Sequence, residues 1–391
     1  MEREPGEVEV SQELFDSRLS SREFPFDSGV WRFKELVHPL VEKGCVASKA
    51  EGNTRIYSHG KVDSFTGCSV RLKHEGENPT GSFKDRGMTA GVSEALRQGA
   101  RVVACASTGN TSASLASYAA LAGLQAVVFI PDGKIAFGKL AQTMAYGARV
   151  LKVKGNFDDA MRLVQESASE LGLYLLNSVN PWRIEGQKAI AFELLQQSGW
   201  VAPDWVCLPA GNLGNTTALG KAFLEARELG LVDSVPRIAS VQASGANPFY
   251  CAWRDSAELV PVAAPHTVAS AINIGNPLSW RKAMRVIRET RGVVTEVSDE
   301  EILCAKEVVD AAGVGCEPAS AAGVAGARKL RQEGVIGAGE SVVCILTGNI
   351  LKDPDTTVNY HLGNLQVKPA RANAPTPVEA DVAAIRRALG A

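Results

Sequence analysis

The ten residues 78–87, NPTGSFKDRG, combine a tight turn with the start of a helix. Pro79 fixes its own φ and Gly81 permits a positive φ, so a turn is expected before Ser82. Ser82 is a good N-cap residue, and residues 88–96 have the composition of a helix that follows it. This stretch therefore predicts a preformed turn that leads into a helix.

Lys84 would lie in the first turn of that helix. The helix dipole places partial positive charge there, so a lysine at this end is locally disfavoured. Its amine pKa can be lowered in such a position, which suits a nucleophile that forms an imine with an aldehyde. A surface lysine that happens to fall near a helix start is the simpler alternative, because most lysines are exposed. A second signal is needed to choose between the two.

Residues 208–217 supply that second signal. They follow an apolar run at 205–208 and precede a helical pattern at 218–229. A strand, a glycine-bearing loop and a helix N-terminus together offer several backbone N–H groups to a phosphate. Taken alone, the loop could also be an ordinary Gly/Asn turn. The residues of this predicted phosphate cup are Gly211, Asn212, Leu213, Gly214 and Asn215.

The predicted phosphate cup does not match a nucleotide-binding motif. It lacks the Gly-Lys-Ser/Thr ending of a Walker A loop and the G-x-G-x-x-G spacing of a dinucleotide site. An NAD-dependent dehydrogenase is therefore disfavoured, since the acidic residue downstream of that motif is missing as well. A reactive lysine and a phosphate cup without a nucleotide motif suggest pyridoxal phosphate (PLP) as the cofactor.

Four motifs, in this order along the chain, resemble those of threonine synthase, a fold-type-II PLP enzyme of the tryptophan-synthase β group. They are NPTGSFKDRG at 78–87, STGNTS at 107–112, GNLGN at 211–215 and LTG at 346–348. The segments GKIA at 133–136, GKLAQ at 138–142, NSVNP at 177–181 and EPASA at 317–321 resemble this family in particular. The resemblance extends from about Tyr57 to Leu389.

The resemblance implies that Lys84 binds PLP covalently and shuttles protons during catalysis, with Phe83 also at the cofactor. Asn110 corresponds to the family's asparagine beside the ring and its 3-hydroxyl, although a plain helix entry is the alternative for this residue. Thr347 matches the family position that faces the ring nitrogen. A hydroxyl there, unlike a carboxylate, does not hold a proton on that nitrogen, so the ring is expected to be a milder electron sink.

Threonine synthases convert O-phospho-L-homoserine and water to L-threonine and phosphate, and the resemblance implies that reaction here. The departing phosphate needs a cationic clamp and several hydroxyl or amide donors. Arg183 corresponds to the family's phosphate-binding arginine; the alternative is an arginine on a helix surface. The other implied substrate-binding residues are Asn177, Ser178 and Thr111 for the phosphate, Lys134 and Lys139 as additional cations, and Ser107, Thr108 and Gly109 for the carboxylate.

Two departures from the family's commoner pattern concern the pocket. Residues 348–351 read GNIL where Gly-His-Gly-Leu is more usual, and Leu213 stands where a smaller residue is usual. Either could reshape the pocket, so a same-fold PLP enzyme with another substrate remains an alternative. Such an enzyme would be a threonine or serine dehydratase or a β-replacement synthase. A catalytically silent PLP-fold binding protein is a further alternative, against which the intact Lys84 argues.

The composition is that of an ordinary globular protein. The chain has 391 residues, 45% of them hydrophobic, and a formal net charge of −2, so no nucleic-acid or membrane partner is indicated. The first ten residues lack a secretory signal, and the eight cysteines form no C-x-x-C pair. We expect no bound metal, a cytoplasmic location and a small-molecule amino-acid phosphate as the partner. The family resemblance further implies a homodimer.

Short apolar strands alternate with helices that end at glycine, which predicts an α/β protein with mostly parallel sheets covered on both faces. The resemblance implies two doubly wound domains of the tryptophan-synthase β type. We expect an N-terminal extension at 1–30, a large PLP-binding domain at 31–85 plus 185–375, and a small domain at 86–184 inserted in it. A C-terminal helix at 376–391, opened by Thr376 and Pro377, is expected to pack on the large domain.

Overall fold

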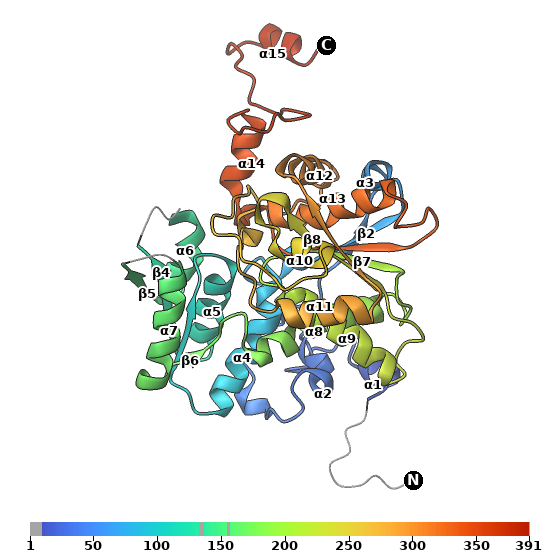
Figure 1. Cartoon of the computed structure of the whole chain (residues 1–391). Helices are drawn as coiled ribbons and strands as arrows, with labels where there is room; N and C mark the ends of the chain where they lie inside the picture. The colour runs from blue at the N-terminus through green and yellow to red at the C-terminus, as the bar shows by residue number, and fades with distance from the viewer. Residues whose placement is uncertain (1–9, 133–136, 155–156, 391) are drawn as a thin grey trace.

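The computed structural model describes residues 10–132, 137–154 and 157–390, and its elements are arranged around two separate sheets (Figure 1). The larger sheet has the strand order β1-β2-β10-β7-β8-β9. Only β1 runs antiparallel to its neighbour; the other strands are parallel. The strands are β1 (Ile56–Ser58), β2 (Val70–His74), β7 (Trp205–Pro209), β8 (Arg237–Ala243), β9 (Val293–Val297) and β10 (Val342–Leu346).

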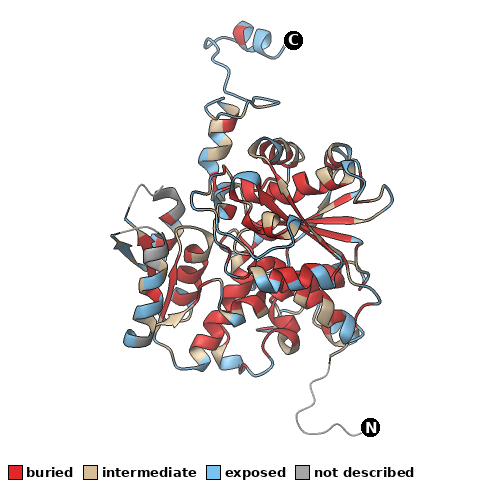
Figure 2. Cartoon of the chain, in the orientation of Figure 1, coloured by how far each residue is buried: buried red, intermediate tan, exposed pale blue. Residues whose placement is uncertain are grey.

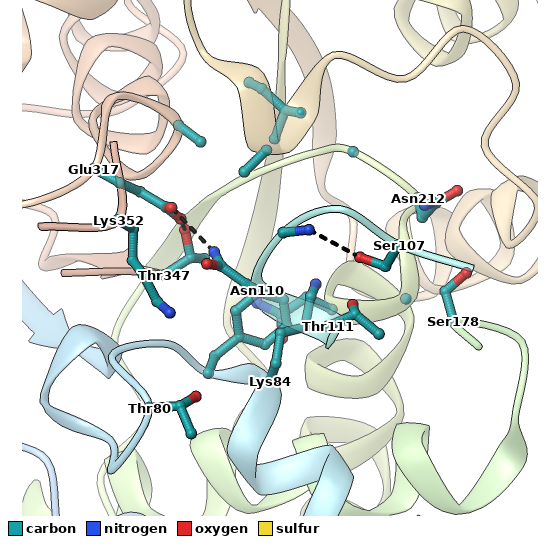
Figure 3. A pocket seen from close by; sticks show the side chains of 18 of the residues that line it. Thr80, Lys84, Ser107, Asn110, Thr111, Ser178, Asn212, Glu317, Thr347 and Lys352 are labelled. Carbon is teal, nitrogen blue, oxygen red and sulfur yellow. Dashed lines mark hydrogen bonds between the residues drawn. The ribbon is translucent and has the colours of Figure 1, made fainter. Parts of the chain in front are cut away.

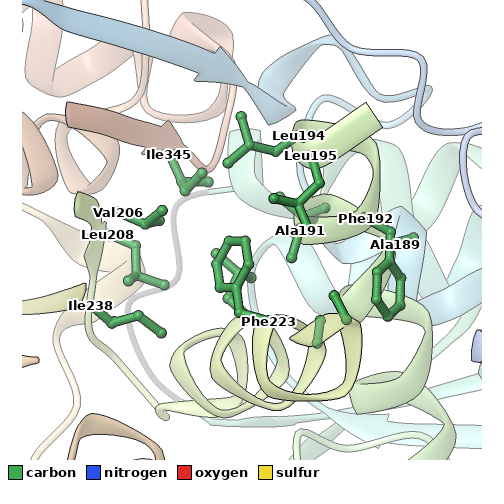
Figure 4. Close-up of a cluster of buried hydrophobic side chains, with 14 of the residues drawn as sticks. Ala189, Ala191, Phe192, Leu194, Leu195, Val206, Leu208, Phe223, Ile238 and Ile345 are labelled. Atoms are coloured by element: carbon green, nitrogen blue, oxygen red, sulfur yellow. The ribbon is translucent and has the colours of Figure 1, made fainter. Parts of the chain in front are cut away.

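Helices cover both faces of the larger sheet, as its apolar central strands β7 and β10 predict. One face packs against α8 (Pro181–Gln197), α9 (Gly214–Glu228) and α11 (Trp280–Glu289), and the other against α3 (Gly60–Thr66), α12 (Asp299–Ala311) and α13 (Pro318–Gln332). Figure 4 shows the core between the sheet and the first of these two sets of helices, where Phe192 of α8 and Phe223 of α9 lie with Val206 and Leu208 of β7. Figure 2 shows that this part of the molecule is largely buried.

The smaller sheet is fully parallel, with the strand order β5-β4-β3-β6. Its strands are β3 (Val102–Ala106), β4 (Gln125–Pro131), β5 (Arg149–Val153) and β6 (Tyr174–Leu175). The helices α4 (Lys84–Arg97), α5 (Asn110–Leu121) and α6 (Phe137–Ala145) pack on one face, and α7 (Phe157–Leu171) packs on the other. This sheet and α5–α7 form the lobe on the left of Figure 1.

The remaining helices are α1 (Gln12–Ser17), α2 (Lys34–Val37), α10 (Pro248–Arg254), α14 (Pro354–His361) and α15 (Val382–Ala388). The segment predicted as an N-terminal extension contributes to the main core from residue 10 onward. Phe15 of α1 is fully buried and lies 5.2 Å from Phe33 between ring centroids. No helix in the described ranges is long and apolar enough to cross a bilayer.

The start of the last helix was predicted incorrectly. Residues 376–381 are not helical, and α15 begins at Val382 with Asp381 as its N-cap, whose Oδ1 accepts a hydrogen bond from the Ala384 N–H at 2.7 Å. In contrast to the expectation that this helix packs on the large domain, it stands clear of the two sheets (Figure 1). Val382 and Leu389 are 74% and 77% exposed. Seven helical residues after a Pro/Ala-rich linker carry too little apolar area to fix the helix in place.

Candidate active site

One cavity of about 790 Å³ lies between the two sheets, at the carboxyl ends of their strands. Ligand sites of parallel α/β proteins lie at such strand ends, and this volume suits a cofactor with a small substrate. The cavity brings together every predicted site residue whose side chain the structure describes (Figure 3). These are Phe83, Lys84, Ser107, Thr108, Gly109, Asn110, Thr111, Asn177, Ser178, Arg183, Gly211, Asn212, Leu213, Gly214, Asn215 and Thr347. Lys134 lies outside the described residues, and so does the side chain of Lys139.

The lysine turn forms as predicted, but the predicted cap does not. Gly81 has φ +85°, and its N–H donates to the Asn78 carbonyl at 2.7 Å. The helix α4 begins at Lys84 without a side-chain cap, and the Ser82 hydroxyl is buried without a hydrogen-bond partner among the described residues. Ser82 instead forms a β-bridge with Gly348. That contact with a strand end far along the chain holds the residues before Lys84 against the larger sheet.

The Lys84 amine lies in the cavity, 3.9 Å from the centroid of the Phe83 ring. Burial in the cavity wall, and to a smaller extent the positive charge of Arg183, lower its pKa to about 7 against the opposing effect of Glu317. A large fraction of the amine is therefore neutral near pH 7, the state in which it can act as a nucleophile or accept a proton.

The predicted phosphate cup has the geometry of an anion site. Leu213 has φ +65° and precedes α9, so the first N–H groups of this helix, from Gly214 onward, point out of its N-terminus without intrahelical partners. The Leu213 side chain is 2% exposed and packs in the main core. This unusual residue therefore stabilises the loop from behind and leaves the backbone of the cup open.

Two buried side chains in the cavity wall have polar atoms without a hydrogen-bond partner within the described part of the chain. Asn215 is 7% exposed, and neither its Oδ1 nor its Nδ2 atom is hydrogen-bonded. Arg183 is 1% exposed; its NH1 atom donates to the Leu176 carbonyl at 3.0 Å, while its Nε atom has no partner. Buried polar groups are nearly always satisfied, so both indicate a polar ligand in this cavity. Burial lowers the pKa of Arg183 to about 10.

Asn177 has a different environment from the one expected. Its Oδ1 atom accepts a hydrogen bond from the Ala106 N–H at 3.1 Å, and its Nδ2 atom lies 2.7 Å from the Met161 sulfur. Both ends of the amide are thus engaged with the protein, where they join the end of β3 to α7. In this structure the Asn177 side chain stabilises the cavity wall, and its polar atoms are bonded to the protein.

The residue that replaces the usual histidine after β10 is also engaged with the protein. Asn349 caps the short 3-10 helix η6 (Ile350–Lys352), because its Oδ1 atom accepts from the Leu351 N–H at 3.0 Å. Its own N–H donates to the Gly81 carbonyl at 2.9 Å. Asn349 therefore fixes the lysine turn against η6.

The sequence did not predict Glu317 and Lys352, which are charged residues of the cavity wall. Glu317 is 4% exposed and accepts from Asn110 Nδ2 at 3.1 Å and from Thr347 Oγ1 at 3.2 Å. Lys352 donates to Gln142 Oε1 at 2.5 Å, which connects η6 to α6 of the smaller lobe. Glu317 is the first residue of the EPASA run, which resembles the family motif, but nothing local in the sequence indicates that its carboxylate lines the cavity.

Below the lysine turn, a buried ionic cluster fixes α4 relative to the sheet and α8. Arg86 donates to Glu75 and Glu193, and all three residues are fully buried. Lys73 and Arg32 also pair with Glu193, at 2.5 and 3.0 Å. Because α8 carries both Glu193 and Arg183 of the cavity wall, this cluster fixes α4, which begins at Lys84, relative to α8.

The described residues fit PLP by their own geometry: a lysine amine, an anion cup and unpartnered amide atoms line one cavity. No group of three or more potential metal ligands is found in the described part of the chain. Comparison with known proteins also indicates a PLP-dependent enzyme, because a family model described as pyridoxal-phosphate dependent enzyme matches residues 47–348.

The relatives narrow this class to one family. The chain is 44% identical over 384 residues to threonine synthase of Methanocaldococcus jannaschii, an alignment that covers 97% of this chain and 91% of that relative. It is 48% identical over 363 residues to threonine synthase of Methanosarcina acetivorans, covering 92% and 86%. The chain belongs to the threonine synthase family.

Solved structures confirm the predicted fold class. Maize serine racemase superposes with a TM-score of 0.70 at 21% identity, covering 86% of this chain and 97% of that one. The processed form of threonine deaminase isoform 2 from Solanum lycopersicum gives 0.68 at 21% identity, covering 78% and 88%. At 21% identity, the similarity to these structures establishes only the fold, which is that of the fold-type-II PLP enzymes.

Proposed function

We propose that this protein is a PLP-dependent lyase that converts O-phospho-L-homoserine and water to L-threonine and phosphate. The observation that carries the proposal is Arg183, a buried cation whose side chain has no carboxylate partner among the described residues. It lines the same cavity as Lys84. A phosphate on the substrate would satisfy this charge, whereas the unphosphorylated substrate of a dehydratase would leave it buried and unpaired.

The residues present suit the cofactor's separate parts. The N-terminus of α9, from Gly214, would hold its phosphate, and Asn215 would supply amide groups that now lack partners. Asn110 and Thr347, which lie on opposite sides of Glu317, would face the ring. When bound, PLP supplies an electron sink that makes proton removal from the substrate's α- and β-carbons feasible.

The side chains and backbone groups of the cavity perform the remaining steps of the proposed reaction. A neutral Lys84 amine accepts the α-proton, releases it, and only then accepts a β-proton, since its lowered pKa lets it gain and lose protons near neutral pH. Arg183 and the hydroxyls of Thr111 and Ser178 hold the substrate phosphate and stabilise it as it leaves. The N-terminus of α5, preceded by Ser107–Gly109, would bind the substrate carboxylate through backbone N–H groups. The hydroxyl of water then adds at the β-carbon and its other proton goes to the departing phosphate, while the two protons removed by Lys84 are replaced at the γ- and α-carbons.

We also propose that the protein acts as a cytoplasmic homodimer with two domains. The eight cysteines are all free, which fits a reducing compartment. The exposed apolar residues of α15 would be covered by a second copy. The strand membership of the two sheets supports a small domain at 86–184 within a large one at 31–85 plus 185–375.

A substrate comparison tests the proposed reaction. The PLP-loaded protein is offered O-phospho-L-homoserine, L-threonine and O-acetyl-L-serine in parallel, and the products are identified. We expect threonine and phosphate in equal amounts from the first compound. Ketobutyrate from threonine as the main product would instead show a dehydratase, and an exchange product from O-acetylserine would show a β-replacement enzyme.

A further inference from the structure

Lys352 extends from η6, on the side of the larger sheet, to the smaller lobe. It lies on the same side of the cavity as Glu317 and Thr347 (Figure 3). Its Nζ atom donates to Oε1 of Gln142, a residue of α6, at 2.5 Å. Burial lowers the pKa of this amine, and the charges of Asp85 and Glu317 oppose the shift. Because an amine has N–H groups to donate in either protonation state, the contact between the two lobes does not depend on its charge.

The segment that carries Lys352 is anchored on the side of the larger sheet. The Asn349 N–H donates to the Gly81 carbonyl at 2.9 Å, and the Lys352 N–H donates to the Asn349 carbonyl at 3.0 Å. The side chain of Lys352 passes directly over the lysine turn, because its Cε atom lies 3.2 Å from where a Cβ at Gly81 would be. Asp353 accepts from Ser270 Oγ at 2.7 Å at the other end of the segment. The amine therefore extends from a firmly held base.

On the other side of the contact, α6 is bonded to the start of α5. Thr143, the residue after Gln142, is fully buried, and its hydroxyl donates to Ser112 Oγ at 3.2 Å. Ser112 Oγ in turn donates to the Gly109 carbonyl at 2.8 Å. Gly109 ends the turn that is proposed to bind the substrate carboxylate. The contact made by the Lys352 amine is thus continued, through α6 and two further hydrogen bonds, to this turn.

We propose that Lys352 is a positioning residue for the reaction: through Gln142 it keeps α6 and the start of α5 against the bound substrate until water has added. This rests on the proposed function, in which the turn before α5 binds the substrate carboxylate. Without the contact, the smaller lobe separates from the larger one more often after the phosphate has left, and the unsaturated amino acid escapes. Its C=N tautomer then takes up water and loses ammonia, which gives 2-ketobutyrate. Each route consumes one water and releases one phosphate, so the routes differ only in whether the product keeps its nitrogen.

The first test is hydrogen exchange at the backbone amides of α6 and of the start of α5 in the PLP-loaded protein. Lys352→Met and Gln142→Leu remove the same hydrogen bond from its two ends. Each should speed this exchange by up to roughly tenfold, the effect of losing one hydrogen bond. The double variant should exchange no faster than either single variant, because the contact can be lost only once. Lys352→Arg keeps a donor and should stay close to wild type.

The second measurement is the ratio of 2-ketobutyrate to threonine formed from O-phospho-L-homoserine by the same proteins. Lys352→Met and Gln142→Leu should each raise this ratio by up to roughly tenfold, and Lys352→Arg should restore it at least in part. Lys49→Met is the matched control. Lys49 Nζ donates to Ser117 Oγ of α5 at 2.9 Å, so it also joins a lysine to the smaller lobe, but neither residue lines the cavity. Its product ratio should equal that of wild type.

A change in Lys352→Met that Gln142→Leu does not reproduce would overturn the inference, because Lys352 would then act on the bound molecules directly. Additive effects in the double variant, or unchanged exchange and product ratio in both single variants, would overturn it as well. A wild-type protein that forms no threonine from O-phospho-L-homoserine would overturn the proposed function itself. Failure of the inference alone would leave threonine formation by wild type intact, so the two outcomes are distinguishable.

Discussion

Replacement of Arg183 by methionine should stabilise the ligand-free protein while it disables the phosphate site. Burial lowers the pKa of this guanidinium from 12.5 to about 10. At about 1.36 kcal/mol for each pKa unit, keeping the guanidinium charged at this site costs about 3.4 kcal/mol. The hydrogen bond from Arg183 to the Leu176 carbonyl offsets about 1.5 kcal/mol of this cost. Arg183→Met, of similar volume, should therefore raise the free energy of unfolding by roughly 2 kcal/mol.

The assay is urea unfolding of wild type and Arg183→Met, with and without inorganic phosphate. With PLP filling the cup before α9 in both proteins, phosphate at a hundred times its dissociation constant should stabilise wild type by about 2.7 kcal/mol and leave the variant unchanged, so the order of stability reverses. Arg86→Met is the control, because Arg86 is equally buried but bonded to Glu75 and Glu193; it should lose about 3–5 kcal/mol. A strongly destabilised Arg183→Met that still responds to phosphate would refute the reasoning.

Three further predictions follow from the same contacts. The rate at which the apoprotein captures PLP, followed by absorbance, should rise with pH to a midpoint near 7, because only the neutral Lys84 amine reacts; a midpoint near 10.5 would show an ordinary lysine. Gly348→Ala should weaken PLP binding roughly tenfold or more in an equilibrium titration, since its Cβ meets Glu317 at 2.5 Å, whereas Gly60→Ala, with no atom within 4 Å, should bind normally. The cations around Glu193 hold its pKa well below 4.5 against the effect of burial, so its ionised form contributes stability above pH 4.5 that is lost as the pH falls. Glu193→Gln should therefore weaken the decrease of the thermal unfolding temperature at acid pH, and an unchanged decrease would argue against the ionic cluster.

Features encoded by neighbouring residues could be predicted from the sequence. The turn before Lys84 and the loop before α9 depend on Pro, Gly and apolar runs within a few positions, and both formed where expected. The capping box at Ser298 and Glu301 is present for the same reason. The alternation of apolar strands with glycine-ended helices likewise indicated the fold class, because each unit must bury its own apolar face.

Features that depend on distant contacts could not be predicted in this way. Ser82 has the chemistry of a cap, but its bridge to Gly348 places it in a different geometry. Glu317 lies 207 positions from Asn110, so its part in the site is invisible until the two sheets are assembled. The start of α15 was misplaced because Thr376-Pro377 and Asp381 offer competing helix starts, and only Asp381 caps in the structure.

The proposed function requires that Lys84 and the loop before α9 bind the same small molecule, and borohydride reduction of the PLP-loaded protein tests this directly. Reduction makes the bond between an amine and PLP permanent, and mass spectrometry of the digested protein then locates it. We predict one modified residue, Lys84, in a protein that releases threonine and phosphate from O-phospho-L-homoserine before reduction. An unmodified Lys84, or a label on Lys352 at the same cavity, would contradict the account.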